Sequence, residues 1–167
     1  MHGDWTLKLF DVDGSLARTI EFENALSPFG DQAIAEFISG FKAPGRWSVA
    51  LDGGADPACV GPAGPKGYVV TGADDPSIQT HLFKTLTLEV PHAGENADAF
   101  VLNGTMTAQR TETITRVSTG VGSCEPDTTP TGCTASGGRV ITLTDLAEAV
   151  DVILNQQIAV EVVLSFQ

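Results

Sequence analysis

The sequence predicts a mainly β fold, an antiparallel β-sandwich or jelly roll with one short N-terminal amphipathic helix. Three observations favour it. A single helical period occurs early in the chain, six or more short apolar segments follow with turn residues between them, and the last segment, residues 158–166, has a strict period of two. Of the 167 residues, 42% are hydrophobic, so we expect one domain, residues 1–167, with a sizeable core.

The first expected element is a β-hairpin. Leu7 and Leu9 alternate with polar residues before the segment Asp11-Val12-Asp13-Gly14-Ser15, and residues 16–23 continue with a period of two after it. Asp and Gly are turn residues, because the Asp side chain bonds to nearby backbone and Gly adopts a positive φ at no steric cost. The pattern therefore favours two strands joined by a tight turn.

A short helix is expected next, at about Phe29–Ser39. Ser27-Pro28 is a typical helix start, and Gly40 lies near the end. Apolar residues fall at positions i, i+3, i+4 and i+7, namely Ile34, Phe37, Ile38 and Phe41. We expect this apolar stripe to pack against a sheet in the core.

The remaining elements are strands and loops. Residues 46–51 are predicted as a buried strand, and further strands are expected at residues 68–71, 81–90, 99–106, 112–118, 140–143 and 158–166. Long loops are predicted at about 52–67 and 119–138, and loops of this length often form contact surfaces. Residues 144–154 fit both a helix capped by Thr144 or Asp145 and a strand in which Val150, Val152 and Leu154 alternate.

The charge balance disfavours two classes of partner. Nine Lys and Arg stand against 21 Asp and Glu, which gives a net charge of -12 and argues against nucleic-acid binding. No apolar run approaches the roughly 20 residues that cross a bilayer. The N-terminus, MHGDWTLKLF, has neither a basic leader nor a long apolar region. We therefore expect no membrane partner and a soluble chain made in the cytoplasm.

Cysteine and histidine usage leaves one question open. Cys124 and Cys133 bracket a loop rich in Pro, Thr and Gly, and either a disulfide or two free thiols fit them. Cys59 lies alone, no Cys-x-x-Cys pair exists, and the three histidines, His2, His81 and His92, are scattered. We therefore expect no metal site and no cofactor.

The two tryptophans also allow two interpretations. Trp5 and Trp47 are either core residues or aromatic anchors of an interface. Aromatic residues are enriched at interfaces, but burial in the core is the preferred interpretation.

One motif supports a catalytic alternative. The segment Leu9-Phe10-Asp11-Val12-Asp13-Gly14-Ser15-Leu16 resembles the first motif of the haloacid dehalogenase-like phosphatases. This resemblance implies that Asp11 is the nucleophile, that Asp13 is the general acid and that a Mg²⁺ lies between carboxylate and phosphate. Such a phosphatase also needs repeated strand-helix units and later motifs, of which only a fragment, residues 69–75, is found. The turn interpretation is preferred, and no catalytic, cofactor-binding or metal-binding residues are expected.

The segments at residues 11–54 and 155–166, towards the two ends of the chain, resemble a group of small virion proteins of tailed bacteriophages. Members of that group open with a strand, a D-x-x-G hairpin, a strand ending in E-x-x-N, and a Gly before an I-A-x-x-[IL]-x-G helix. The matching segments here are residues 11–14, residues 21–24, Gly30 and residues 34–40. A strand running into a glycine pair, residues 49–54, and a polar turn before an alternating last strand, residues 155–166, match as well. The middle, residues 55–138, matches loosely.

The resemblance implies a structural component of the particle, either a capsid decoration (cement) protein or a tail or fibre-attachment protein. The implied partners are the major capsid protein or tail components, together with further copies of the chain, with a trimer as the first expectation. The implied location is the virion, after synthesis in the host cytoplasm. A carbohydrate-binding β-sandwich is a further alternative, indicated by the possible disulfide and the jelly-roll pattern. Against it, 7% of residues are aromatic and Tyr68 is the sole tyrosine.

Overall fold

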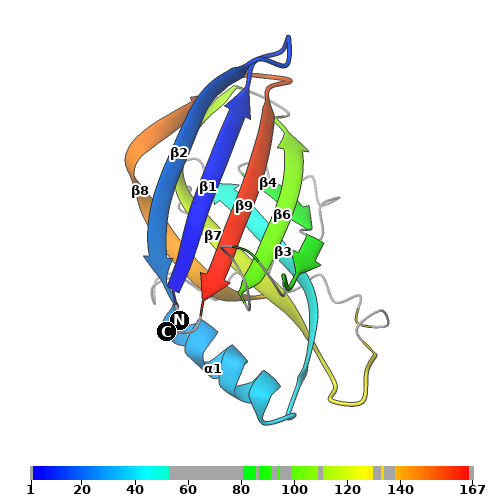
Figure 1. The fold of residues 1–167 in the computed structure, drawn as a ribbon. Coiled ribbons are helices and arrows are strands. Elements are labelled where there is room, and N and C mark those ends of the chain that lie inside the picture. The colour runs from blue at the N-terminus through cyan, green and yellow to red at the C-terminus, as the bar shows by residue number, and fades with distance from the viewer. Residues whose placement is uncertain are drawn as a thin grey trace.

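A computed structural model of the chain describes residues 2–52, 81–85, 87–91, 94, 99–108, 111–129, 133 and 138–165. These residues form two antiparallel β-sheets and one short helix, so the predicted mainly β fold is confirmed (Figure 1). The jelly-roll connectivity stays a prediction. The predicted strand at 68–71 and the predicted loop beyond Asp52 lie outside the described residues.

One sheet has five strands in the order β2-β1-β9-β6-β5. Their bounds are His2–Phe10 for β1, Leu16–Ala25 for β2, Thr87–Glu89 for β5, Phe100–Thr107 for β6 and Gln157–Ser165 for β9. The first and last strands of the described chain are therefore neighbours, with Gly3 opposite Leu164 and Phe10 opposite Gln157. The hairpin β1–β2 and the alternating last strand were both predicted and are confirmed.

The second sheet has four strands in the order β4-β3-β7-β8. Their bounds are Ala43–Asp52 for β3, His81–Thr85 for β4, Glu112–Cys124 for β7 and Gly138–Val152 for β8. The single strand expected at 81–90 is wrong, because β4 and β5 divide this segment between the two sheets.

The hydrophobic core lies between the inner faces of the two sheets. Alternation places Trp5, Leu7 and Leu9 of β1 on the inner face, and the period-two residues of β9 beside them. Val49, Leu51, Val117 and Val121 meet them from the other sheet. Trp5 and Trp47 are 1% and 6% exposed, so their core interpretation is confirmed.

The helix α1, Pro28–Ile38, lies across one end of the sandwich near both chain termini (Figure 1). Ser27 caps it, accepting a hydrogen bond from Gly30 N at 2.9 Å, and also donates from its hydroxyl to Val140 O at 2.7 Å. The predicted apolar stripe is partly wrong, because Ile38 and Phe41 are 80% and 66% exposed. The helix approaches β8 through its N-terminal half instead, where Gly30 and Ala33 are buried.

The predicted loop at 119–138 begins too early. Its first six residues belong to β7, and β8 extends from Gly138 through the ambiguous segment 144–154 as far as Val152. Thr119 and Thr142 are fully buried, and their hydroxyls hydrogen-bond to each other at 2.7 Å. Small and hydroxyl-bearing residues indicated a loop, but burial between neighbouring strands decided their structure.

Candidate functional site

The segment that resembles the phosphatase motif is a tight turn between β1 and β2. Asp11 N donates to Ser15 O at 2.8 Å, and Gly14 N donates to Asp11 O at 2.8 Å. Gly14 has a φ of 86°, a conformation that glycine adopts without strain. Asp13 Oδ1 accepts from both Ser15 N at 2.9 Å and Ser15 Oγ at 2.7 Å. Asp11, Asp13, Gly14 and Ser15 thus each have a role in closing the hairpin, whereas Val12 is 67% exposed.

The electrostatics of Asp13 oppose the role of general acid. The hydrogen bond from the Ser15 side chain, with a second from the Ser15 backbone, lowers the pKa of Asp13 below its usual value. A general acid must carry its proton near the working pH, so effective acids of this kind have raised rather than lowered pKa values. The position and the lowered pKa of Asp13 are those of a residue that stabilises a turn.

The surroundings of Asp11 and Asp13 also differ from those that the phosphatase needs. Both side chains are exposed at the tip of an antiparallel hairpin, whereas the resemblance implies a strand followed by a loop or helix. Among the described residues, no group of three His, Cys, Asp or Glu side chains is arranged to hold a metal ion. The fragment at 69–75, together with His92 and Cys59, lies outside the described residues. That the protein is not an enzyme stays a prediction.

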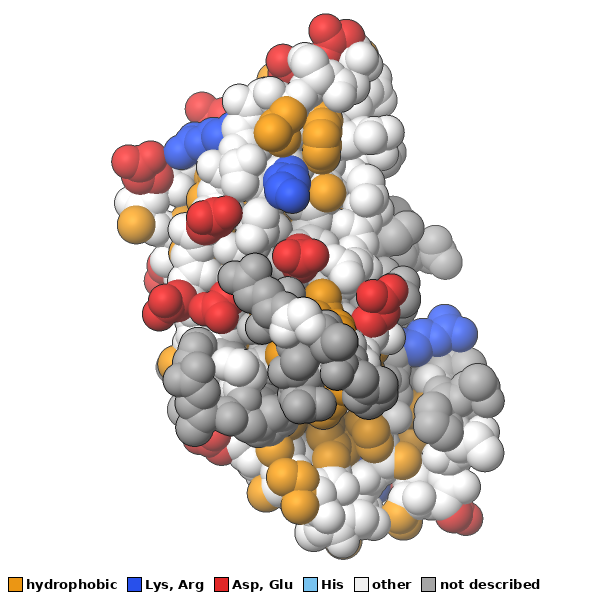
Figure 2. Space-filling view, in the orientation of Figure 1, with side chains coloured by type: hydrophobic (Ala, Val, Ile, Leu, Met, Phe, Trp, Pro, Cys, Tyr) orange, Lys and Arg blue, Asp and Glu red, His pale blue; other side chains and the backbone are white. Residues whose placement is uncertain are grey.

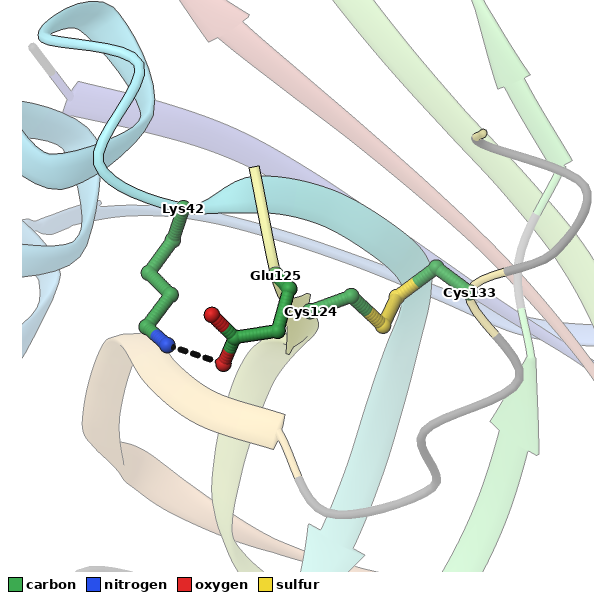
Figure 3. The surroundings of a disulfide bond; sticks show 4 residues. All are labelled: Lys42, Cys124, Glu125 and Cys133. Atoms are coloured by element: carbon green, nitrogen blue, oxygen red, sulfur yellow. Dashed lines mark hydrogen bonds and ion pairs between the residues drawn. A yellow bond between two sulfur atoms is a disulfide. The ribbon is translucent and has the colours of Figure 1, made fainter. Parts of the chain in front are cut away.

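The open question about the cysteines is answered by a disulfide between Cys124 and Cys133 (Figure 3). Their Cα atoms lie 5.8 Å apart, and Cys133 is fully buried. Its sulfur lies against Gly45, where a Cβ would overlap it, within the irregular pairing of β3 and β7. Beside the bond, Lys42 Nζ contacts Glu125 Oε1 at 2.6 Å. Together these contacts tie the segment after β7 to the beginning of β3.

The outer face of the five-stranded sheet is acidic. Alternation places five carboxylates on it, those of Asp4, Glu21, Glu23, Glu89 and Glu161, with Lys8 as a cation on the same face. Asp4 and Glu23 are direct cross-strand neighbours, and like charges in this position destabilise a sheet. Figure 2 shows acidic side chains spread over this side of the molecule. Cations or basic groups at this face would relieve the repulsion between these carboxylates.

Two strand edges meet beside this face. The outermost strand of one sheet, β2, and the outermost strand of the other, β8, approach each other at one end, where Leu26 forms a bridge with Thr142 and Ser27 N donates to Ile141 O at 2.8 Å. Away from that end β8 turns aside (Figure 1). An ion pair of 3.1 Å between Arg18 and Glu148 spans the two strands there.

A large bulge explains why β8 turns aside. Ile114 of β7 pairs with Val150 and Arg116 pairs with Asp145, so four residues of β8, 146–149, lie opposite the single residue Thr115. Bulges bend a strand and redirect its edge. Sequence reasoning missed this pair of edges, because strand order depends on contacts distant in the chain. The one local signal was the run Ala147-Glu148-Ala149, which interrupts the apolar alternation.

None of the described helices is long and apolar enough to cross a membrane. Comparison of the chain with protein-family models, with curated proteins and with solved structures gave no match.

Proposed function

We propose that this protein is a structural component of a bacteriophage particle, a capsid decoration (cement) protein or a tail or fibre-attachment protein, which acts through protein-protein contacts. One observation carries the proposal. The segments that resemble phage virion proteins come from opposite ends of the chain, and they form one continuous body in which β9 pairs along the whole of β1 and α1 follows β2. If the resemblance lay only in unrelated turns, the matching segments would not be expected to lie side by side in one body.

The distribution of apolar residues supports a role in assembly. Four exposed apolar residues lie at the tips of the β1–β2 and β8–β9 connections, namely Val12, Leu16, Ile153 and Leu154, each 48–67% exposed. The two connections adjoin, because Phe10 pairs with Gln157. Ile38 and Phe41 are exposed on α1 and just after it, and α1 lies at the other end of the sandwich (Figure 1). Exposed apolar groups at both ends favour contacts with neighbouring subunits.

The charge of the protein supports a position on the outside of the particle. A net charge of -12 and an acidic sheet face would repel packaged DNA, so contacts with the major capsid protein or tail components fit better. Self-association belongs to the proposal, with a trimer expected first. In this proposal the chain is made in the host cytoplasm and then becomes part of the virion.

Light scattering of the purified protein tests the proposal. We expect a trimer or a larger ring without phosphatase activity, and a Leu154→Asp variant that dissociates while Thr105→Asp, on an exposed sheet position, does not. The contrary result is a monomer that hydrolyses a generic phosphoester with Mg²⁺ and loses this activity on Asp11→Asn.

The disulfide and the two packed sheets are compatible with the carbohydrate-binding alternative, but they do not supply a sugar-binding surface. A sugar platform usually needs an exposed Trp or Tyr, and both tryptophans of the chain are buried in the core. Tyr68 lies outside the described residues.

A further inference from the structure

We propose that the free edge of β2, from Leu16 to Phe22, binds an extended segment of a partner protein as an added strand, and that the outward-facing side chains of this segment are basic. The inference deepens the proposed function by naming a docking surface and its partner's chemistry. It rests on that function only in requiring a protein partner.

The backbone of β2 supplies the first reason. Within the described part of the chain, β2 pairs with β1 on one side, and its other side meets a strand only beyond its end, at the Leu26–Thr142 bridge. The bulge in β8 carries the neighbouring edge away from β2. Alternate N–H and C=O groups of β2 therefore point to the open side, and such an edge is a template for a further strand.

The inner face of β2 supplies the second reason. Ile20 and Phe22 pack against the core but are only partly buried, although their neighbours on β1, Leu7 and Trp5, are about 1% exposed. Phe22 stacks on Trp5 with 5.4 Å between the ring centroids. The two side chains are partly exposed because none of the described strands lies beyond them in the sheet. An added strand with apolar residues on its inner face would cover them.

The outer face of β2 identifies the occupant by its charge. Glu21 and Glu23 are exposed on this face, and Asp145 and Glu148 of β8 are exposed nearby, with side chains 72% and 82% accessible. If a second copy paired through its own β2, the two rows of glutamates would adjoin, and like charges opposite each other are destabilising. A segment with Lys or Arg at alternate positions would instead place cations beside these carboxylates.

The Arg18–Glu148 ion pair lies at the boundary of this edge. Arg18 belongs to the inner row of β2, since it pairs with buried Leu9, and it reaches Glu148 in the β8 bulge at 3.1 Å. Both side chains are largely exposed, 45% and 82%, and exposed ion pairs are weak. The pair therefore closes the edge only loosely, and an entering strand would displace it.

Fluorescence polarisation of a labelled ten-residue peptide of alternating Val and Lys tests the inference. Two control peptides carry methyl groups on the backbone nitrogens, one on its valines and the other on its lysines. In an added strand only alternate backbone N–H groups face the edge of the sheet, so either the valine amides or the lysine amides form the hydrogen bonds to β2. The control peptide that is methylated on those amides should bind at least tenfold more weakly than the parent peptide. Hydrogen exchange should show that the bound parent peptide protects amides of β2. Equal binding of all three peptides would overturn the inference, because charge attraction alone would explain it.

Two glutamates provide a matched pair of variants. Glu21 and Glu161 both flank Thr6 on the outer face, on opposite sides of β1, and only Glu21 lies on the edge strand. We expect Glu21→Lys to weaken peptide binding at least fivefold and Glu161→Lys to change it less than twofold, with thermal unfolding confirming that both fold. Equal effects of the two variants would contradict the inference.

The remaining outcomes are equally decisive. Absence of peptide binding to the folded protein would overturn the docking edge, yet leave the proposed function standing if light scattering still shows a trimer or ring. Protection of β2 amides that rises with protein concentration, without any peptide, would also overturn it, because a second copy would then occupy the edge.

Discussion

Substitution of Gly30 by alanine sets two effects of opposite sign against each other. Alanine is favoured over glycine within a helix by up to about 1 kcal/mol, so helix propensity alone predicts a more stable protein. Gly30 is buried beneath β8, however, and a Cβ at this position would overlap the carbonyl oxygen of Ile141. The obstructing atom belongs to the backbone of a paired strand, so the helix must move rather than the strand.

The cost of that movement follows from the contacts between α1 and β8. Ser27 makes two hydrogen bonds to β8, its N–H to Ile141 O at 2.8 Å and its hydroxyl to Val140 O at 2.7 Å. Each contributes about 0.5–1.5 kcal/mol net, so weakening both costs about 1–3 kcal/mol. Ala33, fully buried against the core, loses packing as well. After the gain in helix propensity of up to about 1 kcal/mol is subtracted, the two hydrogen bonds leave a cost of about 0–2 kcal/mol. The lost packing of Ala33 adds to this cost, so we expect Gly30→Ala to lower the free energy of unfolding.

Urea denaturation of the wild type and the variant measures this difference, with the slope of the transition expected to stay unchanged. Ala35→Gly is the matched control, because Ala35 is exposed on the same helix and should lose only the propensity of about 1 kcal/mol. An increase in the free energy of unfolding of Gly30→Ala would refute the close approach of α1 to β8.

Three further predictions concern the disulfide, the hairpin turn and the ion pair. The Cys124–Cys133 bond closes a loop of about 10 residues and contributes about 3 kcal/mol by loop closure. Its reduction should therefore lower Tm by about 6–12 °C, measured by calorimetry with and without reductant. An unchanged Tm would contradict the loop-closure argument. Ser15→Ala should raise the pKa of Asp13 towards its ordinary value in an NMR titration, since it removes the side-chain hydrogen bond that lowers this pKa most and keeps the backbone one. Because the pKa of Asp13 is lower in the folded state, its contribution to stability is present above the unfolded pKa and is lost as pH falls through the folded pKa. Ser15→Ala should therefore make the stability less dependent on acid pH. Identical stability-against-pH profiles of the variant and the wild type would contradict this prediction. Glu148→Ala should change the free energy of unfolding by less than about 1 kcal/mol in urea denaturation, because the pair is exposed, and a larger loss would mean that the ion pair holds β2 and β8 together.

Local pattern was sufficient to predict the elements whose two faces differ in polarity. β9 alternates between the core and the outer face, and the β1–β2 hairpin combines such alternation with an Asp-Gly turn. The N-terminus of α1 was predictable because Ser27 and Pro28 act locally. In these segments the chain's own periodicity carries the information about burial.

Elements decided by distant contacts were not predictable in the same way. β7 continues through Gly120 and Gly122, which indicated a loop, because both are buried between β3 and β8. The segment 144–154 has a capping pattern at Thr144 and alternation later, and only pairing with β7 selected the strand. The proposed docking edge depends on sheet order, which no local pattern gives. The D-V-D-G-S segment was predicted as a turn, but the hydrogen bonds that Asp13 accepts from Ser15 are known only from the structure.

The pairing of β9 with β1 has a consequence for folding during synthesis. The β1–β2 hairpin leaves the ribosome early, but the other edge of β1 must wait for β9, which is made after all the other described strands. Until then the apolar row Trp5, Leu7 and Leu9 lacks its neighbours Val160 and Val162. Long sequence separation between partners slows folding, and exposed strand edges invite association with other nascent chains. Chains truncated before β9 should therefore aggregate rather than fold to a partial sandwich.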